Sequence, residues 1–302
     1  MLKGSMRRIA LLLLLLCGVS TSVLAVTVQD QRGTFSIDYI PKRIVVLEFS
    51  FADALAAVHV SPVGIADDKD AERLLPAVRA QFSDWVSVGT RSQPSLEMIA
   101  ALQPDLIIAD ADRHAAVYDD LAKIAPTLML HSRRETYADN LAAAAVIGTV
   151  VGKAQAMQQR LALHQQRMAE YRQQLHALQG KTLLFGVARE NAFHAHGNDS
   201  YAGGVAQALG FKSPPALYND RASHQIGLEQ LLAINPDYLV VGDYTPNSII
   251  RRWKKQPLWQ MLGAVRAHHV ISVSGNLWSR CRGILAAEYM AKDLLQLVSP
   301  SS

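Results

Sequence analysis

Short apolar runs alternate with amphipathic patterns of helical period along most of the chain. The apolar runs expected to form strands are residues 44–47, 60–65, 106–109, 127–130, 183–187 and 238–241. The helical patterns between them cover residues 51–58, 94–102, 114–124, 201–209 and 228–234. Strands alternating with helices are typical of parallel sheets, so the pattern predicts two α/β lobes.

A long helical pattern separates the two groups of elements. Residues 153–179 contain no glycine or proline, are bounded by Gly152 and Gly180, and carry apolar side chains that include Met157, Leu161 and Met168. At 1.5 Å per residue this segment would form a helix of roughly 40 Å, long enough to brace both lobes. An ordinary lobe helix of unusual length is the alternative that spacing alone leaves open.

One internal repeat relates the lobes to each other. Residues 95–109 (SLEMIAALQPDLIIA) recur as residues 227–241 (GLEQLLAINPDYLVV). Each copy predicts a helix, a Pro-Asp turn and a buried parallel strand, with Pro104 or Pro236 ending the helix. Two similar α/β lobes usually bind a ligand in the crevice between them, at the carboxyl ends of their strands.

The beginning of the chain has the features of a secretory signal. Lys3, Arg7 and Arg8 precede an apolar run that ends before a small-residue cleavage pattern at Ala25. The expected organisation is therefore a signal peptide (1–25), an N-terminal lobe (26–152), a connecting helix (153–179) and a C-terminal lobe (180–302). The mature protein is therefore expected to be exported.

Charge and cysteine usage narrow the possible partners. Removing the signal peptide takes away three cations and no acid, which lowers the formal charge from +4 to +1. No nucleic-acid partner is expected from so small a charge. Cys281 is then the only cysteine, which excludes an intrachain disulfide and a multi-cysteine metal site.

Motifs for catalysis are absent, and signals for a metal are weak. The sequence has no Gly-x-Ser-x-Gly elbow, no His-Glu-x-x-His pair and no complete phosphate-binding loop. An exported hydrolase using Asp110, Asp243 or a histidine has the weakest support. His194 and His196 would face the same way in a strand, but two histidines without a third ligand do not define a metal site.

Arginines follow several predicted strands where the lobes should face each other. Guanidinium groups bind carboxylates through paired hydrogen bonds, so converging arginines would suit a polycarboxylate ligand. The candidate ligand-binding residues are Arg91, Arg113, Arg189, Arg280, Arg282 and the neighbouring Trp278. For each arginine a solvated or salt-bridged role remains open, and Trp278 could instead fill a lobe edge. Arg160, on the long helix, is expected to be a surface arginine.

Four segments resemble the iron(III) dicitrate-binding periplasmic proteins, which are the solute receptors of ABC importers. They are residues 44–58 (IVVLEFSFADALAAV), 88–97 (VGTRSQPSLE), 257–262 (PLWQML) and 282–288 (RGILAAE). The resemblance covers nearly the whole mature chain and is looser at residues 194–224. It implies two α/β lobes joined by one rigid helix, a fold shared with siderophore, haem and cobalamin receptors.

The resemblance also implies a function in iron uptake rather than catalysis. Ferric citrate would arrive through an outer-membrane receptor, bind in the periplasm and pass to an inner-membrane ABC permease dimer with its ATPase subunits. Citrate would hold the iron, so no cofactor and no direct metal ligand from the protein are expected, and the protein would act as a monomer. Another siderophore, haem or cobalamin is the alternative cargo.

Two glutamates occupy equivalent positions in the repeat. Glu97 and Glu229 each lie at the start of a predicted helix, one in each lobe. A carboxylate there interacts favourably with the helix dipole, which could explain both residues. The resemblance instead implies that each glutamate docks into an arginine pocket on one permease subunit.

Overall fold

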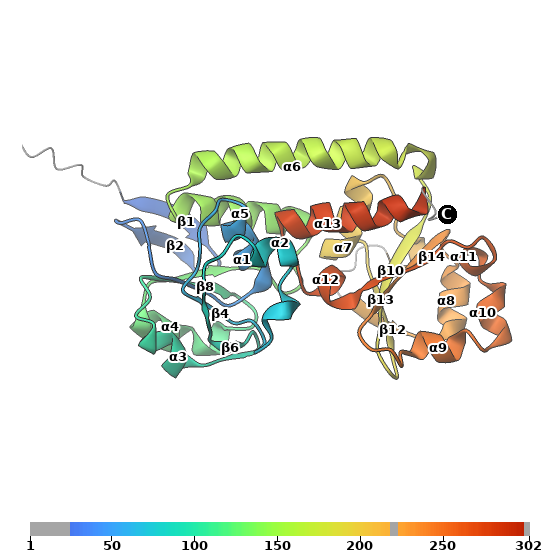
Figure 1. The fold of residues 1–302 in the computed structure, drawn as a ribbon, viewed down its shortest axis with the longest axis horizontal. Helices are drawn as coiled ribbons and strands as arrows, with labels where there is room; N and C mark the ends of the chain where they lie inside the picture. Colours follow the sequence, from blue (N-terminus) through green and yellow to red (C-terminus); the bar gives the residue numbers. More distant parts are fainter. Residues whose placement is uncertain (1–24, 218–222, 299–302) are drawn as a thin grey trace, which may run out of the picture.

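The computed structural model describes residues 25–217 and 223–298, so the signal peptide expected at residues 1–25 lies outside the described residues except for Ala25. Two α/β lobes lie side by side beneath one long helix (Figure 1). Within the described ranges, no helix is both long enough and apolar enough to cross a membrane.

The N-terminal lobe is built on a parallel sheet of five strands in the order β5-β4-β3-β8-β9. Its strands are β3 (Ile44–Val46), β4 (Gly64–Ile65), β5 (Val86–Ser87), β8 (Leu106–Asp110) and β9 (Thr127–Leu130). Its helices are α1 (Phe49–Ala56), α2 (Pro76–Arg79), α3 (Leu96–Ala101), α4 (Tyr118–Ile124) and α5 (Tyr137–Val150). Two antiparallel hairpins join the lobe, β1–β2 (Val26–Asp30, Gly33–Ile37) and β6–β7 (Gly89–Thr90, Gln93–Pro94).

The C-terminal lobe has a mixed sheet in the order β12-β11-β10-β13-β14. Its strands are β10 (Leu183–Ala188), β11 (Phe193–His196), β12 (Ser223–Ile226), β13 (Tyr238–Asp243) and β14 (Val270–Ser274). Strands β10, β13 and β14 are parallel, whereas β11 and β12 run antiparallel to their neighbours. Its helices are α7 (Tyr201–Ala208), α8 (Leu228–Ile234), α9 (Ile249–Trp253), α10 (Pro257–Met261), α11 (Gly263–Arg266), α12 (Gly275–Ser279) and α13 (Ile284–Leu294).

The internal repeat forms equivalent elements in the two lobes. The first copy is α3 followed by β8, and the second is α8 followed by β13. All five residues of β8 are buried, as are the first five of β13, which fits strands covered on both faces. The predicted order of helix, turn and strand is confirmed in both copies.

Helix α6 (Ala154–Gln174) crosses above both lobes (Figure 1). Met157 packs into the core of the N-terminal lobe, and Met168 packs into the core of the C-terminal lobe. The helix therefore braces both lobes, as the sequence predicted. It is shorter than the expected 153–179, because a 3₁₀ turn (His176–Leu178) follows it and directs Leu175 and Leu178 into the core.

Helix α13 is a second connection between the lobes, which the sequence pattern did not reveal. Ile284 and Ala286 belong to the core of the N-terminal lobe, whereas Ala287 and Met290 belong to the core of the C-terminal lobe. Successive faces of one helix thus contribute to two cores. Helix α13 therefore helps to hold the lobes together in addition to α6.

The start of α13 is fixed by one side chain from each lobe. Asp53 of α1 accepts hydrogen bonds from the amides of Leu285 and Ala286, both at 3.0 Å. Tyr201 of α7 donates its hydroxyl proton to the carbonyl of Gly283 at 2.6 Å. Gly283 has φ of 144°, and a Cβ there would lie 2.1 Å from the carboxyl carbon of Asp53, so only glycine fits.

A buried ion-pair cluster ties α13 to α6. Glu288 contacts Arg160 and Arg167 at 2.8 Å and His164 at 2.9 Å. Burial would raise the pKa of Glu288, but its hydrogen bonds with His164 and Arg160 hold the pKa at about 2. Arg160 is only 11% exposed, so the expectation of a surface arginine was wrong. The spacing of residues within α6 does not show that the Arg160 side chain extends to Glu288 on α13.

Asp53→Asn is expected to change how stability depends on pH. Burial raises the pKa of the Asp53 carboxyl to about 7, while the amides of Leu285 and Ala286 oppose that rise. Because this pKa lies above the unfolded value of 3.8, the native state binds more protons, and the free energy of unfolding of the wild type falls as pH rises between these values.

Asparagine does not ionise, so the stability of Asp53→Asn relative to the wild type should rise across this pH window. The expected change is at least about 1.4 kcal/mol, the equivalent of one pKa unit. Urea unfolding of both proteins below, within and above the window measures the difference. A difference that stays constant with pH would contradict the prediction.

Candidate ligand-binding site

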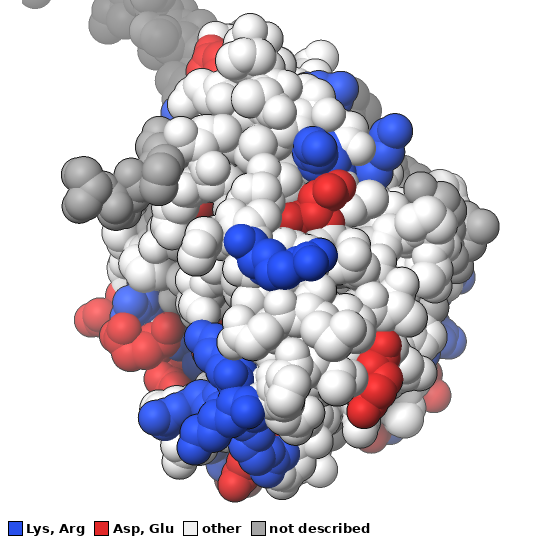
Figure 2. All heavy atoms as spheres, turned by 90° about the vertical axis from the view of Figure 1, so that its right-hand side faces the viewer, with Lys and Arg blue, Asp and Glu red and all other residues white. Residues whose placement is uncertain are grey.

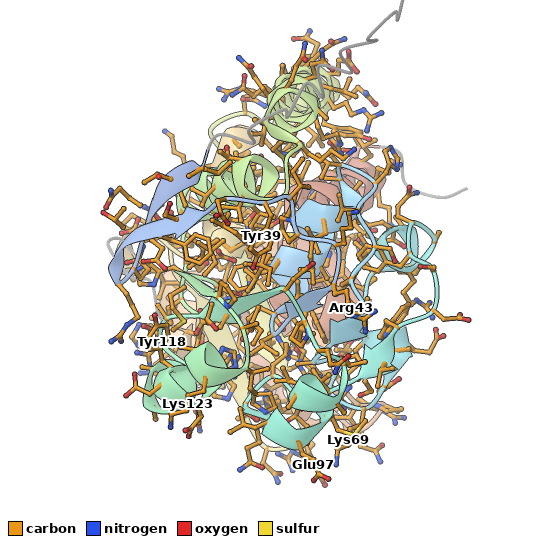
Figure 3. The ribbon with its side chains drawn as sticks, turned by 90° about the vertical axis from the view of Figure 1, so that its left-hand side faces the viewer. Tyr39, Arg43, Lys69, Glu97, Tyr118 and Lys123 are labelled. Atoms are coloured by element: carbon orange, nitrogen blue, oxygen red, sulfur yellow. The ribbon has the colours of Figure 1, made fainter. Side chains whose placement is uncertain are left out.

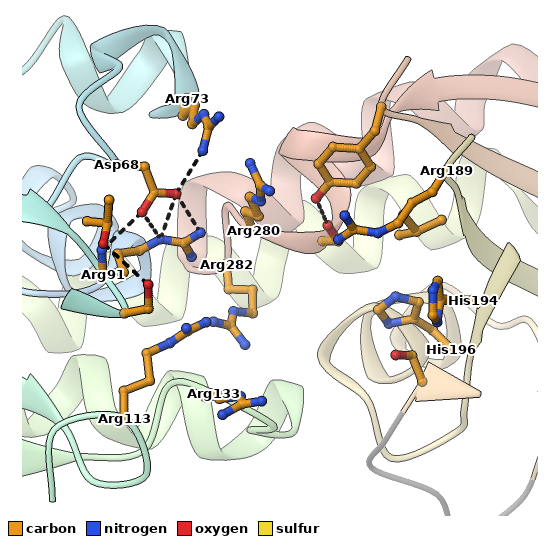
Figure 4. Close-up of a pocket in the computed structure, with 16 residues that line it drawn as sticks. Asp68, Arg73, Arg91, Arg113, Arg133, Arg189, His194, His196, Arg280 and Arg282 are labelled. Atoms are coloured by element: carbon orange, nitrogen blue, oxygen red, sulfur yellow. Dashed lines mark hydrogen bonds and ion pairs between the residues drawn. The ribbon is translucent and has the colours of Figure 1, made fainter. Parts of the chain in front are cut away.

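A strongly basic cleft lies between the two lobes. Its volume is about 570 Å³, and seven arginines line it together with one acidic side chain, Asp68. The arginines are Arg73, Arg91, Arg113, Arg133, Arg189, Arg280 and Arg282. Figure 4 shows them entering the cleft from both lobes. So many guanidinium groups in one cleft would favour a ligand with several negative charges.

Arg91 comes from the hairpin between β6 and β7. It donates from Nη2 to Oδ2 of Asp68 at 2.9 Å and from its backbone amide to Oδ1 at 3.0 Å (Figure 4). Burial would raise the pKa of Asp68, but the hydrogen bonds with Arg91 hold the pKa at about 2. The guanidinium carbon also lies 4.1 Å from the ring centre of Phe49. Arg91 is therefore held rigidly at the wall of the cleft.

Glu48 is a fully buried carboxylate behind the arginines of the N-terminal lobe. It lies two residues after the end of β3 and directly precedes α1, and its Oε1 lies 2.5 Å from Nε of Arg113. Arg91 and Arg282 each approach its Oε2 at 3.6 Å. Glu48 thus offsets part of the repulsion among three neighbouring cations, and Asp68 and Glu135 contribute further negative charge beside Arg91 and Arg282.

Arg189 and Arg280 bring positive charge from the C-terminal lobe. Arg189 follows β10, Arg280 follows α12, and both guanidinium groups lie against the ring of Tyr244, at 5.2 and 4.8 Å from its centre. The Tyr244 hydroxyl is hydrogen-bonded to Ser279. Within residues 25–217 and 223–298, neither arginine has a carboxylate partner, so both keep a free charge for a ligand.

Arg282 lies in the short link between α12 and α13. It donates to the hydroxyl of Ser132 at 3.2 Å, and its Nε lies 3.6 Å from Glu135. A helix beginning near Trp278 would have turned Arg282 away from Arg280. Because α12 ends at Ser279, both arginines lie beyond the helix and both line the cleft.

Trp278 is almost completely buried, with 1% of its surface exposed. Its indole donates to Asp293 at 2.8 Å, and its ring packs 5.1 Å from Phe185 in the core of the C-terminal lobe. It also lines a recess of about 240 Å³ beside the main cleft. Trp278 thus fills the edge of the C-terminal lobe and also borders a recess beside the cleft. Its contact with a ligand stays a prediction.

Among the cleft residues that the sequence analysis did not single out are two arginines and a tyrosine, Arg73, Arg133 and Tyr244. Arg133 follows β9 and Tyr244 follows β13, so the rule that points to strand ends would have identified both. Arg73 lies in a 3₁₀ turn (Ala71–Arg73), far from any strand end, and no sequence signal marks it.

The two histidines of β11 both line the cleft, as their spacing predicted for a strand. Burial lowers the pKa of His196 to about 4, so its ring is neutral, and burial also lowers the pKa of His194. In the part of the chain that the structure describes, no group of three or more His, Cys, Asp or Glu side chains could hold a metal ion.

Glu97 and Glu229 lie on the first turns of α3 and α8, and both are exposed. Figure 3 shows Glu97 at the lower edge of the N-terminal lobe, directed away from it. Among the described residues, neither carboxylate has a hydrogen bond or an ion pair. Ser95 caps α3 by accepting from the amide of Met98 at 3.3 Å, so Glu97 is not the cap.

Comparisons with known proteins agree with this arrangement. A family model described as "Periplasmic binding protein" matches residues 44–277. The chain is 53% identical over 279 residues to the Fe(3+) dicitrate-binding periplasmic protein FecB of Escherichia coli, covering 92% of each chain. It is 38% identical to the Fe(3+)-citrate-binding protein YfmC of Bacillus subtilis, covering 93% of this chain and 88% of that one.

The fold is also similar to solved structures. Staphylococcus aureus SirA complexed with staphyloferrin B gives a TM-score of 0.79 at 24% identity, covering 90% of this chain and 98% of that one. The petrobactin-binding protein YclQ of Bacillus subtilis gives a TM-score of 0.77, also at 24% identity, covering 91% and 98%. These similarities confirm the predicted fold class of two α/β lobes joined by a long helix.

Proposed function

This chain belongs to the periplasmic binding protein family, and from that premise we propose that it captures ferric citrate and delivers it to an ABC permease for iron uptake. Two relatives that cover most of this chain are named for binding iron(III) with citrate. The observation that carries the proposal is the convergence of seven arginines from both lobes on one cleft.

The chemistry of the cleft matches a citrate-chelated metal better than a bare ion. Carboxylates that remain free on a chelate can accept paired hydrogen bonds from guanidinium groups. Arg189 and Arg280 have no carboxylate partner among the described residues, and Arg113 is the most exposed of the three arginines near Glu48. In this proposal citrate holds the iron, and the protein holds the anionic complex.

We assign the ligand contacts to the arginines and the tryptophan predicted from the sequence. These residues are Arg91, Arg113, Arg189, Trp278, Arg280 and Arg282. Arg73, Arg133 and Tyr244 are added from the structure. A haem, cobalamin or other siderophore cargo would keep the fold, but a neutral cargo would leave the free guanidinium groups of the cleft without counter-charges.

The remaining parts of the proposal concern location and partners. A cleaved leader at residues 1–25 would place the protein in the periplasm, where an outer-membrane receptor would supply ferric citrate. An inner-membrane permease dimer with ATPase subunits would accept it, through Glu97 on one lobe and Glu229 on the other. Both carboxylates are exposed and have no hydrogen bond or ion pair with any residue that the structure describes, which supports this docking role.

Isothermal titration calorimetry with the mature protein tests the cargo. Separate titrations with ferric citrate, citrate alone and free iron should give saturable heat with ferric citrate and none with free iron. A negatively charged complex of citrate with a redox-inert trivalent metal should also bind, because the arginines contact the citrate. Heat with free iron alone would contradict the proposal.

A further inference from the structure

A dense run of cations lies on the outer side of the C-terminal lobe. Arg251, Arg252, Lys254 and Lys255 flank Trp253 at the end of α9, and residues 249–256 include no acid. Trp253 is 5% exposed and packs against Phe193, so it anchors the segment in the core while the four cations remain exposed. Figure 2 shows Lys and Arg side chains gathered near the bottom of this face, at the level where Figure 1 places α9.

The charge of this α9 run is not neutralised within the described residues. Arg251 donates to the carbonyl of Pro246 at 3.1 Å and to the amide oxygen of Asn247 at 3.0 Å. Arg252 donates to the amide oxygen of Asn191 and to the carbonyl of Glu190, both at 3.1 Å. These acceptors are uncharged, so the guanidinium groups keep their full charge.

The α9 run adjoins the cleft through Tyr244. Arg251 and Lys254 line a hollow of about 400 Å³, and Tyr244 lines both this hollow and the cleft. The first residue of α9, Ile249, donates its amide to the carbonyl of Arg189 at 2.7 Å. The acid of the hollow, Asp243, accepts from Ser248 at 2.9 Å. The α9 run and the cleft are therefore neighbouring surfaces that share Tyr244.

We propose that the α9 run is an electrostatic steering surface for a polyanionic cargo, distinct from the residues that hold the cargo once bound. A cluster of uncompensated cations beside a basic cleft raises the local concentration of an anion and so raises the association rate. With a mature formal charge of only +1, the bulk field of the protein is weak, so attraction of an anion depends on local clusters, namely the basic cleft and the α9 run beside it. The proposal rests on the anionic cargo proposed above.

Stopped-flow fluorescence with ferric citrate measures the association and dissociation rates separately. The double variant Arg251→Gln/Lys254→Gln should associate about 3- to 10-fold more slowly than the wild type at low ionic strength, with an unchanged dissociation rate. The difference should vanish at about 0.5 M salt, where the Debye length falls to a few ångströms. The matched control Lys153→Gln/Lys292→Gln removes the same charge from α6 and α13, remote from the cleft lining.

Four outcomes would contradict the proposal, each with a different meaning. Equal association rates for the two double variants would rule out a steering role. If Arg251→Gln/Lys254→Gln lost iron uptake in cells while both binding rates stayed at wild-type values, the α9 run would instead contact a protein partner. A faster dissociation rate would make Arg251 and Lys254 contact residues instead. No binding of ferric citrate by the wild type would overturn the proposed cargo itself, which separates that failure from the others.

Discussion

Arg189→Ala and Arg280→Ala should each weaken ferric citrate binding by about 2–5 kcal/mol, the usual cost of removing one partner of a desolvated charge pair. Since 1.4 kcal/mol corresponds to a tenfold change, this loss would increase the dissociation constant by a factor between about 30 and several thousand. These two arginines give the cleanest test, because both lie against Tyr244 and neither has a carboxylate partner among the described residues. Calorimetric titration of each variant with ferric citrate measures the change.

Arg91→Ala and Arg113→Ala should also weaken binding, but they change the protein itself as well. Arg91 holds Asp68, and Arg113 is the cation nearest the buried Glu48. Truncating either side chain leaves a buried carboxylate with fewer partners, which destabilises the fold. Their melting temperatures should therefore fall, whereas those of the Arg189 and Arg280 variants should change little.

The control for this series is Arg172→Ala rather than a change at Arg160. Arg160 is buried against Glu288, so its truncation would disturb the contact between α6 and α13. Arg172 lies in the last turn of α6, is exposed, and its side chain donates a long 3.5 Å hydrogen bond to the carbonyl of Ala208. If three of the four cleft variants bind ferric citrate as the control does, the cleft assignment is wrong.

The features that the sequence predicted are those that depend on local pattern. Apolar runs, helical periods and the repeat predicted both lobes, and the position of arginines after strands predicted much of the cleft. The same rule applied to Glu48, Arg133 and Tyr244 would have added them, since each follows a strand. The sequence analysis considered only arginines after strands, so it missed Glu48, the buried carboxylate that lies beside three of them.

Other features depend on tertiary contacts that no local pattern contains. The apolar positions of α13 do not reveal that Ile284 enters one core and Met290 another. Arg160 pairs with Glu288, which lies far from it in sequence. The pattern of α6 by itself therefore predicts a surface position for Arg160. Such contacts become visible only when the two lobes are brought together.

The double variant Glu97→Ala/Glu229→Ala should keep wild-type affinity for ferric citrate but lose most iron uptake in cells. The two carboxylates occupy equivalent positions on the two lobes, are exposed, and have no internal hydrogen bond or ion pair among the described residues. A two-lobed receptor on a two-fold permease needs one anchor on each lobe. Each single variant should therefore retain part of the uptake, and the double variant should show the most severe loss.

The alternative role of these glutamates is to stabilise helix starts. A carboxylate in the first turn contributes typically 0.3–1 kcal/mol through the helix dipole, so this role predicts lower melting temperatures and normal uptake once the protein is folded. The Ser95 hydroxyl caps α3, and the Gln230 side chain accepts from the amide of Gly227 at the start of α8. Within the part of the chain that the structure describes, Glu97 and Glu229 accept no amide hydrogen bond, so this role would act through the helix dipole and not through capping.

Melting temperature, ferric citrate affinity and uptake of radiolabelled iron, measured on the same variants, separate the two roles. Glu170→Ala is the matched control, since Glu170 is an exposed glutamate on α6 that accepts a hydrogen bond from Gln166 at 2.8 Å and lies outside the repeat. Loss of uptake with unchanged affinity and stability would support docking, because transport alone requires the permease. Normal uptake by the double variant would end the docking proposal and leave the helix dipole as the reason for both glutamates.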